Sequence, residues 1–140
     1  MKRIFWDANV LLDLIDHERE HHLAALELLA LVGKHYGQCL CSWDTLSVID
    51  YVGGKKFGSN DIWDILREIV KEFIIPATGS AAAHAAFQYL SGDYEDAMQI
   101  AAAVAGNADC IVTRDQRGFA NCPIPVLSAT ECVAEMNSTR

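Results

Sequence analysis

Three aspartates stand where a parallel sheet would bring their side chains together. Asp7 directly follows the apolar segment Arg3–Trp6, and Asp115 comes shortly after a second apolar segment, Ala108–Thr113. Asp96 is the polar residue of an otherwise apolar helical stripe. Carboxylates about 4 Å apart repel one another by roughly 1 kcal/mol in water and by about 4 kcal/mol at an effective dielectric of about 20. A divalent cation relieves that repulsion, which makes Asp7, Asp96 and Asp115 candidate ligands for Mg²⁺ or Mn²⁺.

The later part of the chain offers few positive charges to neutralise these acids. From Phe73 to the end there are seven acidic residues and three basic ones, all three of them arginines. The formal net charge of -8 by itself argues against a nucleic-acid partner, because phosphate backbones attract basic surfaces. Basic side chains gather elsewhere, however, at Lys55, Lys56, Arg67 and Lys71. A phosphate polymer could therefore be held there while the acidic pocket holds cations.

Each acid also has an ordinary structural explanation. Asp7 and Asp93 stand where a helix N-cap is expected, and Asp115 stands where a turn residue is expected. Asp96, in the first turn of its helix, suits the helix dipole. Asp44, just past another apolar segment, suits the same role in its own helix. We favour a metal site because a parallel sheet would deliver Asp7, Asp44 and Asp115 to one edge.

Apolar and helical segments alternate along the chain in an order that positions these acids. That alternation is typical of an α/β fold with a mainly parallel central sheet, in which ligands bind beyond the carboxyl ends of the strands. We expect strands at Arg3–Trp6, Gln38–Cys41, Glu72–Pro76, Ala108–Thr113 and Pro125–Leu127. We expect helices after Asp7, over His17–Tyr36, from Trp43 to a break at Gly53-Gly54, from Ser59 to about Lys71, and over Ala81–Leu90, Asp93–Ala105 and Glu131–Met136.

The bulk composition describes a single domain covering residues 1–140. Hydrophobic residues make up 51% and charged residues 21% of the chain, so a sizeable core can form. Five cysteines without CxxC spacing lie in apolar strings, and we expect buried reduced thiols. Asp7 and Asp13 interrupt the apolar opening, which argues against a signal peptide. No apolar segment is long enough to cross a membrane, and we expect a cytoplasmic protein.

A histidine pattern competes with the acids as a metal site. His17 and His21 are spaced i, i+4 on the expected helix, and His22 follows, so two imidazoles could bind zinc together. The flanks are charged, with Glu18 and Glu20, and no HExxH arrangement is present. We therefore interpret this segment as a solvated helix face.

Four segments of the chain stand in a distinctive order. They are DANVLLDLID at residues 7–16, TLSVIDYV at 45–52, GDYEDAMQIAAA at 92–103 and IVTRDQRGF at 111–119. Together they span nearly the whole chain and resemble the PIN domain family, in particular the branch of VapC-type toxins from toxin–antitoxin pairs. The resemblance implies a three-layer α/β/α sandwich that cleaves RNA with Mg²⁺ or Mn²⁺. It also implies a homodimer, for which we expect contacts from Leu12, Ile15, Leu66 and Ile69.

The resemblance assigns roles to individual residues. It makes Asp7, Asp96 and Asp115 the first, third and fourth acids of a catalytic site. Thr113 matches the hydroxyl that usually supports this cluster, and Asn9 matches the polar residue just past the first acid.

Two positions depart from the family pattern. The position of the second acid is occupied by Val48 in this chain. The position before Phe119, where an acid is common in the family, is occupied by Gly118. Asp44 lies one helical turn before Val48 on the same face, so we expect it to replace the second acid in part, through a metal-bound water. We expect Asp93 to support the cluster from the same side of the Asp96 helix.

The leading hypothesis is a metal-dependent endoribonuclease, with an antitoxin protein as its partner and RNA phosphates contacted by Lys55, Lys56, Arg114 and Arg117. The main alternative is a catalytically weak PIN module that acts as a protein-interaction or RNA-binding partner, which the missing second acid favours. A phosphatase of the haloacid-dehalogenase type also places an aspartate after its first strand. That chemistry requires a second aspartate where this chain has Asn9, and a lysine in the later part of the chain, which has none from Phe73 onward.

Overall fold

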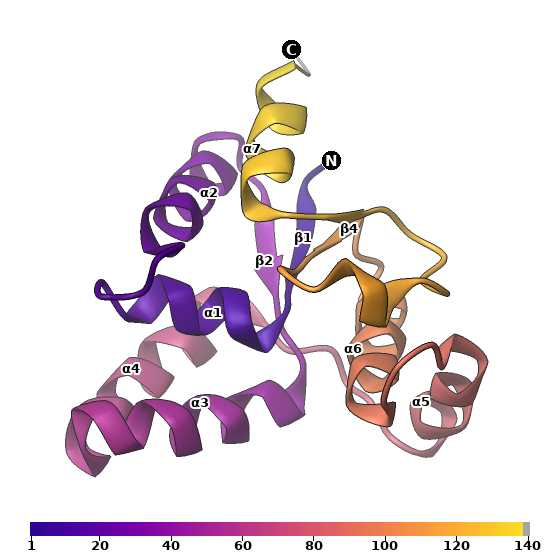
Figure 1. The fold of residues 1–140 in the computed structure, drawn as a ribbon, viewed down its shortest axis with the longest axis horizontal. Coiled ribbons are helices and arrows are strands. Elements are labelled where there is room, and N and C mark those ends of the chain that lie inside the picture. Colours follow the sequence, from indigo (N-terminus) through magenta and orange to yellow (C-terminus); the bar gives the residue numbers. More distant parts are fainter. Residues whose placement is uncertain (139–140) are drawn as a thin grey trace.

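The fold is built on a parallel sheet with helices on both faces (Figure 1). The computed structural model describes residues 1–138, which form a five-stranded sheet in the order β3-β2-β1-β4-β5. The strands are β1 (Arg3–Trp6), β2 (Gln38–Leu40), β3 (Phe73–Ile74), β4 (Cys110–Val112) and β5 (Val126–Leu127). The helices are α1 (Ala8–Ile15), α2 (His22–Lys34), α3 (Trp43–Phe57), α4 (Ser59–Glu72), α5 (Ser80–Ala85), α6 (Tyr94–Ala105) and α7 (Ala129–Ser138). Two 3-10 turns lie at Ala86–Tyr89 and Gln116–Phe119.

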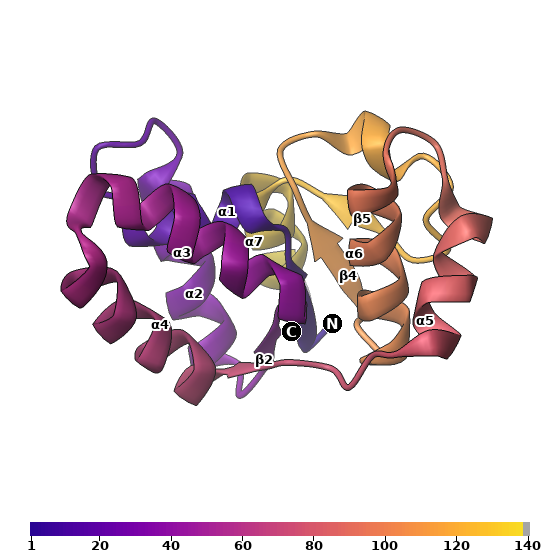
Figure 2. The same ribbon diagram turned by 90° about the horizontal axis from the view of Figure 1, so that it is seen from below.

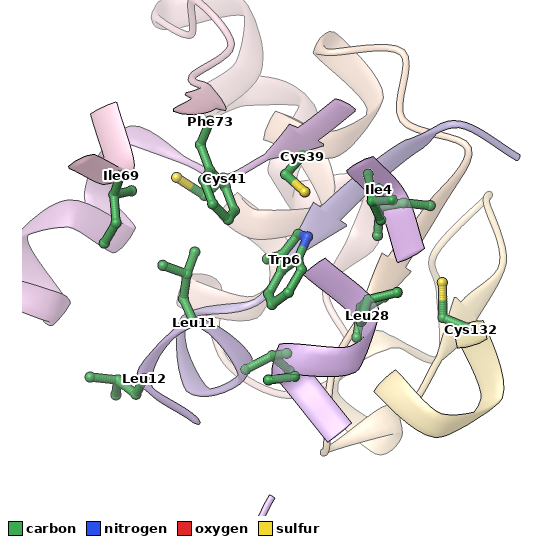
Figure 3. Packing of buried hydrophobic residues seen from close by; sticks show 14 of the residues in the cluster. Ile4, Trp6, Leu11, Leu12, Leu28, Cys39, Cys41, Ile69, Phe73 and Cys132 are labelled. Atoms are coloured by element: carbon green, nitrogen blue, oxygen red, sulfur yellow. The ribbon is translucent and has the colours of Figure 1, made fainter. Parts of the chain in front are cut away.

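The strands alternate their side chains between two apolar layers. Ile4 and Trp6 of β1 belong to a core shared with α1, α2, α4 and α7, where the rings of Trp6 and Phe73 meet edge to face with centroids 5.6 Å apart (Figure 3). Phe5 belongs to a second core, shared with α6. Figure 2 shows α1, α3 and α4 on one side of the strands and α5 and α6 on the other. The expected three-layer α/β/α sandwich with a parallel sheet is confirmed.

The helix predicted over His17–Tyr36 is present from His22 to Lys34, but its predicted start was wrong, because the segment between α1 and α2 is not helical. Helix α2 begins at His22, and residues 17–21 form turns. The Asp16 carboxylate accepts the backbone N–H of Glu18 at 3.0 Å, which stabilises a turn in place of a helix. The two histidines at the ends of this turn segment therefore lack the helical i, i+4 geometry on which the zinc hypothesis depended.

Helix α3 continues through the Gly53-Gly54 pair, where a break was wrongly expected, and ends at Phe57. A Cβ on Gly53 would lie 2.4 Å from Cδ1 of Ile62, so this glycine lets α4 pack closely against α3. The chain turns instead at Gly58, whose φ of 86° lies in the left-handed region that glycine adopts readily. Helices α3 and α4 therefore form one long hairpin.

Two other boundaries differ from the prediction. The strand expected over Glu72–Pro76 is confined to β3. The helix expected over Ala81–Leu90 divides into α5 and a 3-10 turn, because Ala86 packs into a small cluster against Ala97 of α6. Within residues 1–138, none of the helices is both long and apolar enough to cross a bilayer.

The cysteines are free thiols, as their apolar surroundings indicated. All five lie within the described residues, and Cys122 is half-buried while the other four are buried. Burial raises the pKa of both Cys39 and Cys41 to about 12. These two thiols are therefore protonated, and hence poor nucleophiles, at neutral pH.

Candidate active site

One hydroxyl joins two of the predicted metal ligands. Strand β1 leads into Asp7, whose backbone N–H donates to the carbonyl of Val112 in β4 at 3.0 Å. Just past β4, the Thr113 hydroxyl donates to the Asp7 carboxylate at 3.0 Å and accepts the backbone N–H of Asp115 at 3.1 Å. Because β1 and β4 are parallel neighbours, their carboxyl ends bring Asp7, Thr113 and Asp115 to one edge of the sheet.

Asp7 lies where an ionised carboxylate is costly. The residue is 8% exposed, and burial raises the pKa of its carboxyl, an effect that the hydrogen bond from Thr113 partly opposes. Its side chain forms no N-cap hydrogen bond to α1, although the backbone N–H of Ala8 lowers the pKa of its carboxyl. Asn9, two residues later in the first turn of α1, is exposed.

Asp96 joins the cluster from the first turn of α6. Burial raises the pKa of its carboxyl to about 6, and the charges of Asp93, Asp7 and Asp115 act in the same direction. Glu95 also raises the pKa of Asp96 and of Asp7, although the sequence pattern did not single it out. These charges reach Asp96 because the fold brings α6 next to the edge formed by β1 and β4. The three predicted ligands thus share one electrostatic environment.

Two of the acids also have the local roles that were weighed as alternatives. The Asp93 carboxylate accepts the backbone N–H of Asp96 at 2.9 Å and caps α6. The Asp115 carboxylate accepts the backbone N–H of Arg117 at 3.3 Å, at the start of a 3-10 turn. A carboxylate has about four lone-pair positions, so one such hydrogen bond leaves it able to bind a cation.

The PIN domain profile matches residues 3–117. The chain belongs to the PIN domain family. It is 25% identical over 142 residues to ribonuclease VapC1 of Aquifex aeolicus (strain VF5), covering 98% of this chain and 97% of that protein. Its fold is similar to a toxin–antitoxin complex from Klebsiella pneumoniae, with a TM-score of 0.67 and 23% identity over 90% of this chain and 97% of that one. VapBC-1 from nontypeable Haemophilus influenzae is similar with a TM-score of 0.69 and 10% identity, over 91% of this chain and 98% of that one.

At the second departure from the PIN pattern, the Asp96 carboxylate occupies the space of a side chain. A Cβ on Gly118 would lie 2.1 Å from Oδ2 of Asp96, a distance that no real Cβ tolerates. The Ser91 hydroxyl donates to the carbonyl of Gly118 at 2.9 Å and ties the two segments together. Glycine at this position therefore lets Asp96 lie directly against the backbone that follows Asp115.

At the first departure, Asp44 is held by a polar network beside the half-buried Val48. The Ser42 hydroxyl donates to the Asp44 carboxylate at 2.7 Å, and the side-chain amide of Gln99 donates to it at 3.3 Å. Gln99 also donates to the Ser42 hydroxyl at 2.8 Å and is 1% exposed. The network joins α3 to α6, the helix of Asp96. The signal for Gln99 was a polar residue inside an apolar helical stripe.

The two lysines proposed for RNA binding are already engaged. Lys55 donates to the hydroxyl of Tyr51 at 2.7 Å. The ammonium nitrogen of Lys56 lies 2.7 Å from the carboxylates of both Asp16 and Glu18. The contacts of Lys55 with Tyr51 and of Lys56 with Glu18 are exposed, whereas that of Lys56 with Asp16 is part-buried. Each lysine must give up these partners to bind an RNA phosphate.

The arginines that flank Asp115 differ in their surroundings. Arg114 Nε lies 2.9 Å from the carboxylate of Asp13, whose side chain is 2% exposed. Arg19 Nη1 approaches the other oxygen of the same carboxylate at 3.2 Å. Arg117 is 98% exposed, with its Nε 3.9 Å from the Asp115 carboxylate. Sequence reasoning missed Asp13 as a site residue, although an acid inside the apolar run DANVLLDLID was a signal.

The acidic cluster suits a hard divalent cation by its chemistry. Asp7, Asp96 and Asp115 offer only carboxylate oxygens, the donors that Mg²⁺ and Mn²⁺ prefer. Burial first, and then the charges of the neighbouring acids, raise the pKa of Asp96, and a cation relieves repulsion of this kind. As they stand, no three His, Cys, Asp or Glu side chains within residues 1–138 are placed to hold a metal ion together. The fit is therefore one of donor type and charge.

Proposed function

We propose that this PIN domain is an endoribonuclease that hydrolyses RNA phosphodiesters with Mg²⁺ or Mn²⁺ and acts as the toxin of a toxin–antitoxin pair. The observation that supports the proposal most is that Asp7 and Asp115 lie beyond the neighbouring strands β1 and β4, near enough to Asp96 of α6 that their charges add to burial in raising its pKa. The name of the Aquifex aeolicus relative, a ribonuclease, supports the same activity.

The residues of the cluster would divide the work. Asp7, Asp96 and Asp115 would hold the cation, which when bound lowers the pKa of a water molecule and neutralises charge on the reacting phosphate. Thr113 orients the Asp7 carboxylate and fixes the backbone at Asp115. Asp93 holds the first turn of α6, and with it Asp96, in place.

We propose that RNA phosphates are contacted first by Arg114 and Arg117, because these residues flank Asp115 in the chain. A guanidinium can form two parallel hydrogen bonds to a phosphate, which suits both residues to this role. Lys55 and Lys56 would contribute only after exchanging their present partners for phosphate oxygens.

We propose a protein antitoxin as a partner, because the Klebsiella pneumoniae structure that this chain resembles is a toxin–antitoxin complex. Co-expression of the chain with the product of any small gene adjoining its own would test this. Co-purification of the two proteins, with loss of RNA cleavage, is the expected result. Unchanged cleavage in the presence of that product would contradict it.

We also propose a homodimer, although two of the residues expected to form it are unsuitable. Leu12 and Ile69 are 4% and 5% exposed and pack into the core of the single chain. A surface hollow of about 400 Å³ on α4 is a better contact, and it is lined by Trp63, Leu66, Arg67 and Val70. Sedimentation at tens of micromolar should give twice the 15.4 kDa of the chain, and Trp63→Asp should return the monomer.

The alternative function is a catalytically weak PIN module that acts by binding RNA or protein. The observation that favours it is the absence of acids at Val48 and Gly118, together with the engagement of Asp44 by Ser42 and Gln99. Such a module would bind RNA as tightly with EDTA as with a metal and would leave the RNA intact.

The deciding experiment is incubation of the purified chain with a mixed RNA pool in Mn²⁺, in Mg²⁺ and in EDTA. We expect cleavage with either metal, none in EDTA, and none with an Asp96→Asn variant in any condition. Cleavage by Asp96→Asn at the rate of the parent chain would point to a contaminating nuclease. Intact RNA in every condition would favour the alternative.

A further inference from the structure

A surface hollow with both apolar and charged lining lies beside α1. It has a volume of about 400 Å³ and lies between α1, α2 and the first turn of α7. Asp7, Val10 and Asp13 follow one another at three-residue spacing, so they share one side of α1, and the last two line the hollow. The hollow also receives His21, Arg114 and Ser128. It therefore begins about one helical turn from Asp7.

The guanidinium of Arg114, which lines the hollow, is held by the buried carboxylate of Asp13. Asp13 is 2% exposed, and its two oxygens face Arg114 at 2.9 Å and Arg19 at 3.2 Å. Two guanidinium groups face the one Asp13 carboxylate, so Asp13 neutralises only one of their two charges. Asp16 lies 4.0 Å from Arg19 but is bonded to Lys56 at 2.7 Å, and Asp7 interacts electrostatically with Arg114.

Arg114 keeps hydrogen-bonding capacity for a ligand. A guanidinium has five N–H donors, and a single carboxylate oxygen can accept two of them, so at least three remain. Ser128 adds a donor of its own, because its oxygen accepts the backbone N–H of Glu131 at 3.0 Å and leaves the hydroxyl proton available. An anion with several acceptor oxygens matches these donors, and a phosphate is the usual one.

We propose that this hollow binds an RNA phosphate adjacent to the one that is cleaved, with Arg114 as the contact and Asp13 as its positioning residue. The inference rests on the proposed ribonuclease function. RNA is favoured over an acidic protein segment because Arg114 lies between Thr113 and Asp115 in the chain, so the backbone that shapes the cluster also places the guanidinium. A strand of RNA bound at the cluster would reach the hollow along α1.

The test measures binding apart from cleavage. Asp96→Asn serves as the background, and fluorescence anisotropy follows a labelled RNA of mixed sequence at several salt concentrations. Arg114→Gln should weaken binding at least about tenfold, the loss of one charge-assisted hydrogen bond. The slope of log affinity against log salt should fall by about 0.7, the value for one phosphate contact on a single strand. Arg19→Gln removes one charge from the same ion-pair group but no donor from the hollow, so it should lower the slope less than Arg114→Gln does.

Asp13→Asn distinguishes the positioning of Arg114 by Asp13 from a general electrostatic attraction between the protein and RNA. It makes the protein more positive, so simple electrostatics predicts tighter RNA binding, whereas loss of the anchor predicts weaker binding. Thermal melting first checks that the variant folds. Ala24→Glu and Ala24→Gln form a second pair that leaves the ion pairs intact, because Ala24 lines the hollow away from Asp13 in the chain. The glutamate variant should bind RNA more weakly than the glutamine variant.

Equal effects of Arg114→Gln and Arg19→Gln, or equal binding by the two Ala24 variants, would overturn the inference while leaving the ribonuclease proposal intact. If the Asp96→Asn protein does not bind RNA even at the lowest salt concentration, both the phosphate site and the ribonuclease proposal are overturned. If Arg114→Gln abolishes binding of polyglutamate but not of RNA, the occupant is an acidic protein segment and the RNA assignment is wrong.

Discussion

The carboxylate of Asp96 lies against the backbone of Gly118, in the volume that a Cβ at position 118 would fill, 2.1 Å from Oδ2. The contact joins α6 to the 3-10 turn after Asp115, and so joins the two segments that carry Asp96 and Asp115. Any side chain at position 118 must displace Asp96 or the turn.

Gly118→Ala should therefore weaken divalent-metal binding, because Asp96 is pushed away from Asp7 and Asp115. We expect a loss of about ten- to a hundredfold in affinity for Mn²⁺, as for other residues that orient a metal ligand. Isothermal titration with Mn²⁺ measures it. Gly92→Ala is the matched control, since its Cβ would lie 3.5 Å from the same Oδ2, an ordinary contact. Equal affinities for the two variants would show that the Gly118 contact is irrelevant to the metal.

Thr113→Val should destabilise the fold, because it removes the donor to a buried carboxylate and the acceptor of a backbone N–H. We expect a loss of about 1–3 kcal/mol in the free energy of unfolding, measured by urea denaturation. The pKa of Asp7 should rise further, since the Thr113 hydrogen bond holds it down. Thr113→Ser keeps the hydroxyl and should retain metal binding. A valine variant as stable as the serine variant would contradict this account.

Mn²⁺ and Mg²⁺ should raise the melting temperature of the unmodified chain and much less that of Asp96→Asn. A ligand at a hundred times its dissociation constant adds about 2.7 kcal/mol to the stability of the form that binds it. In EDTA the order should reverse, with Asp96→Asn the more stable protein, because one member of a repelling set is neutral. Equal metal-induced shifts in both proteins would remove Asp96 from the ligand set.

The stability of the metal-free protein should fall as the pH rises from about 4 to about 6. The pKa of Asp96 is about 6 in the folded chain and near 3.8 when unperturbed, so between these values the folded state binds more protons than the unfolded state. Acids whose pKa is lowered by folding act in the opposite direction at lower pH, so the quantity to follow is the difference between the parent chain and Asp96→Asn in EDTA. A difference that does not change with pH would contradict the shift.

Asp44→Asn should lower Mn²⁺-dependent cleavage if Asp44 replaces the second acid through water. Asparagine can keep the 2.7 Å hydrogen bond from Ser42 through its carbonyl oxygen and loses only the longer one from Gln99, which goes to the other carboxylate oxygen, so the fold should survive. Val48→Glu should raise cleavage by restoring the acid of the PIN pattern. Unchanged cleavage by Asp44→Asn in the RNA assay, with the melting temperature retained, would rule out the replacement.

The architecture was predictable because short apolar segments alternate with helices and leave few ways to arrange a parallel sheet. The same logic places Asp7 and Asp115 beyond neighbouring strands, and the PIN resemblance adds Thr113. Helix boundaries were less predictable. Residues 17–21 follow a helical pattern of side chains, yet the hydrogen bond from Glu18 to Asp16 selects a turn.

Contacts between distant residues were beyond the reach of the pattern. Nothing in the spacing of Asp13 and Arg114 indicates that they pair, since about a hundred residues separate them and the register of α1 against β4 decides the contact. The space that Gly118 leaves for Asp96 is equally invisible until α6 is packed on the sheet. From the sequence alone, Gly53 was expected to break the helix. Its actual reason, close packing against Ile62, involves a residue of another helix and could not be read from the local pattern.

The two sides of the acidic cluster differ in how they are held. The amide N–H of Asp7 is bonded to Val112 between the central strands β1 and β4, so it should exchange with solvent deuterium only when the whole domain opens. Asp96 sits in the first turn of α6, where its own N–H depends on the Asp93 side chain. The first turn of α6 can unfold while the rest of the domain stays folded. The time for which Asp96 stays beside Asp7 and Asp115 is then set by the stability of this helix end.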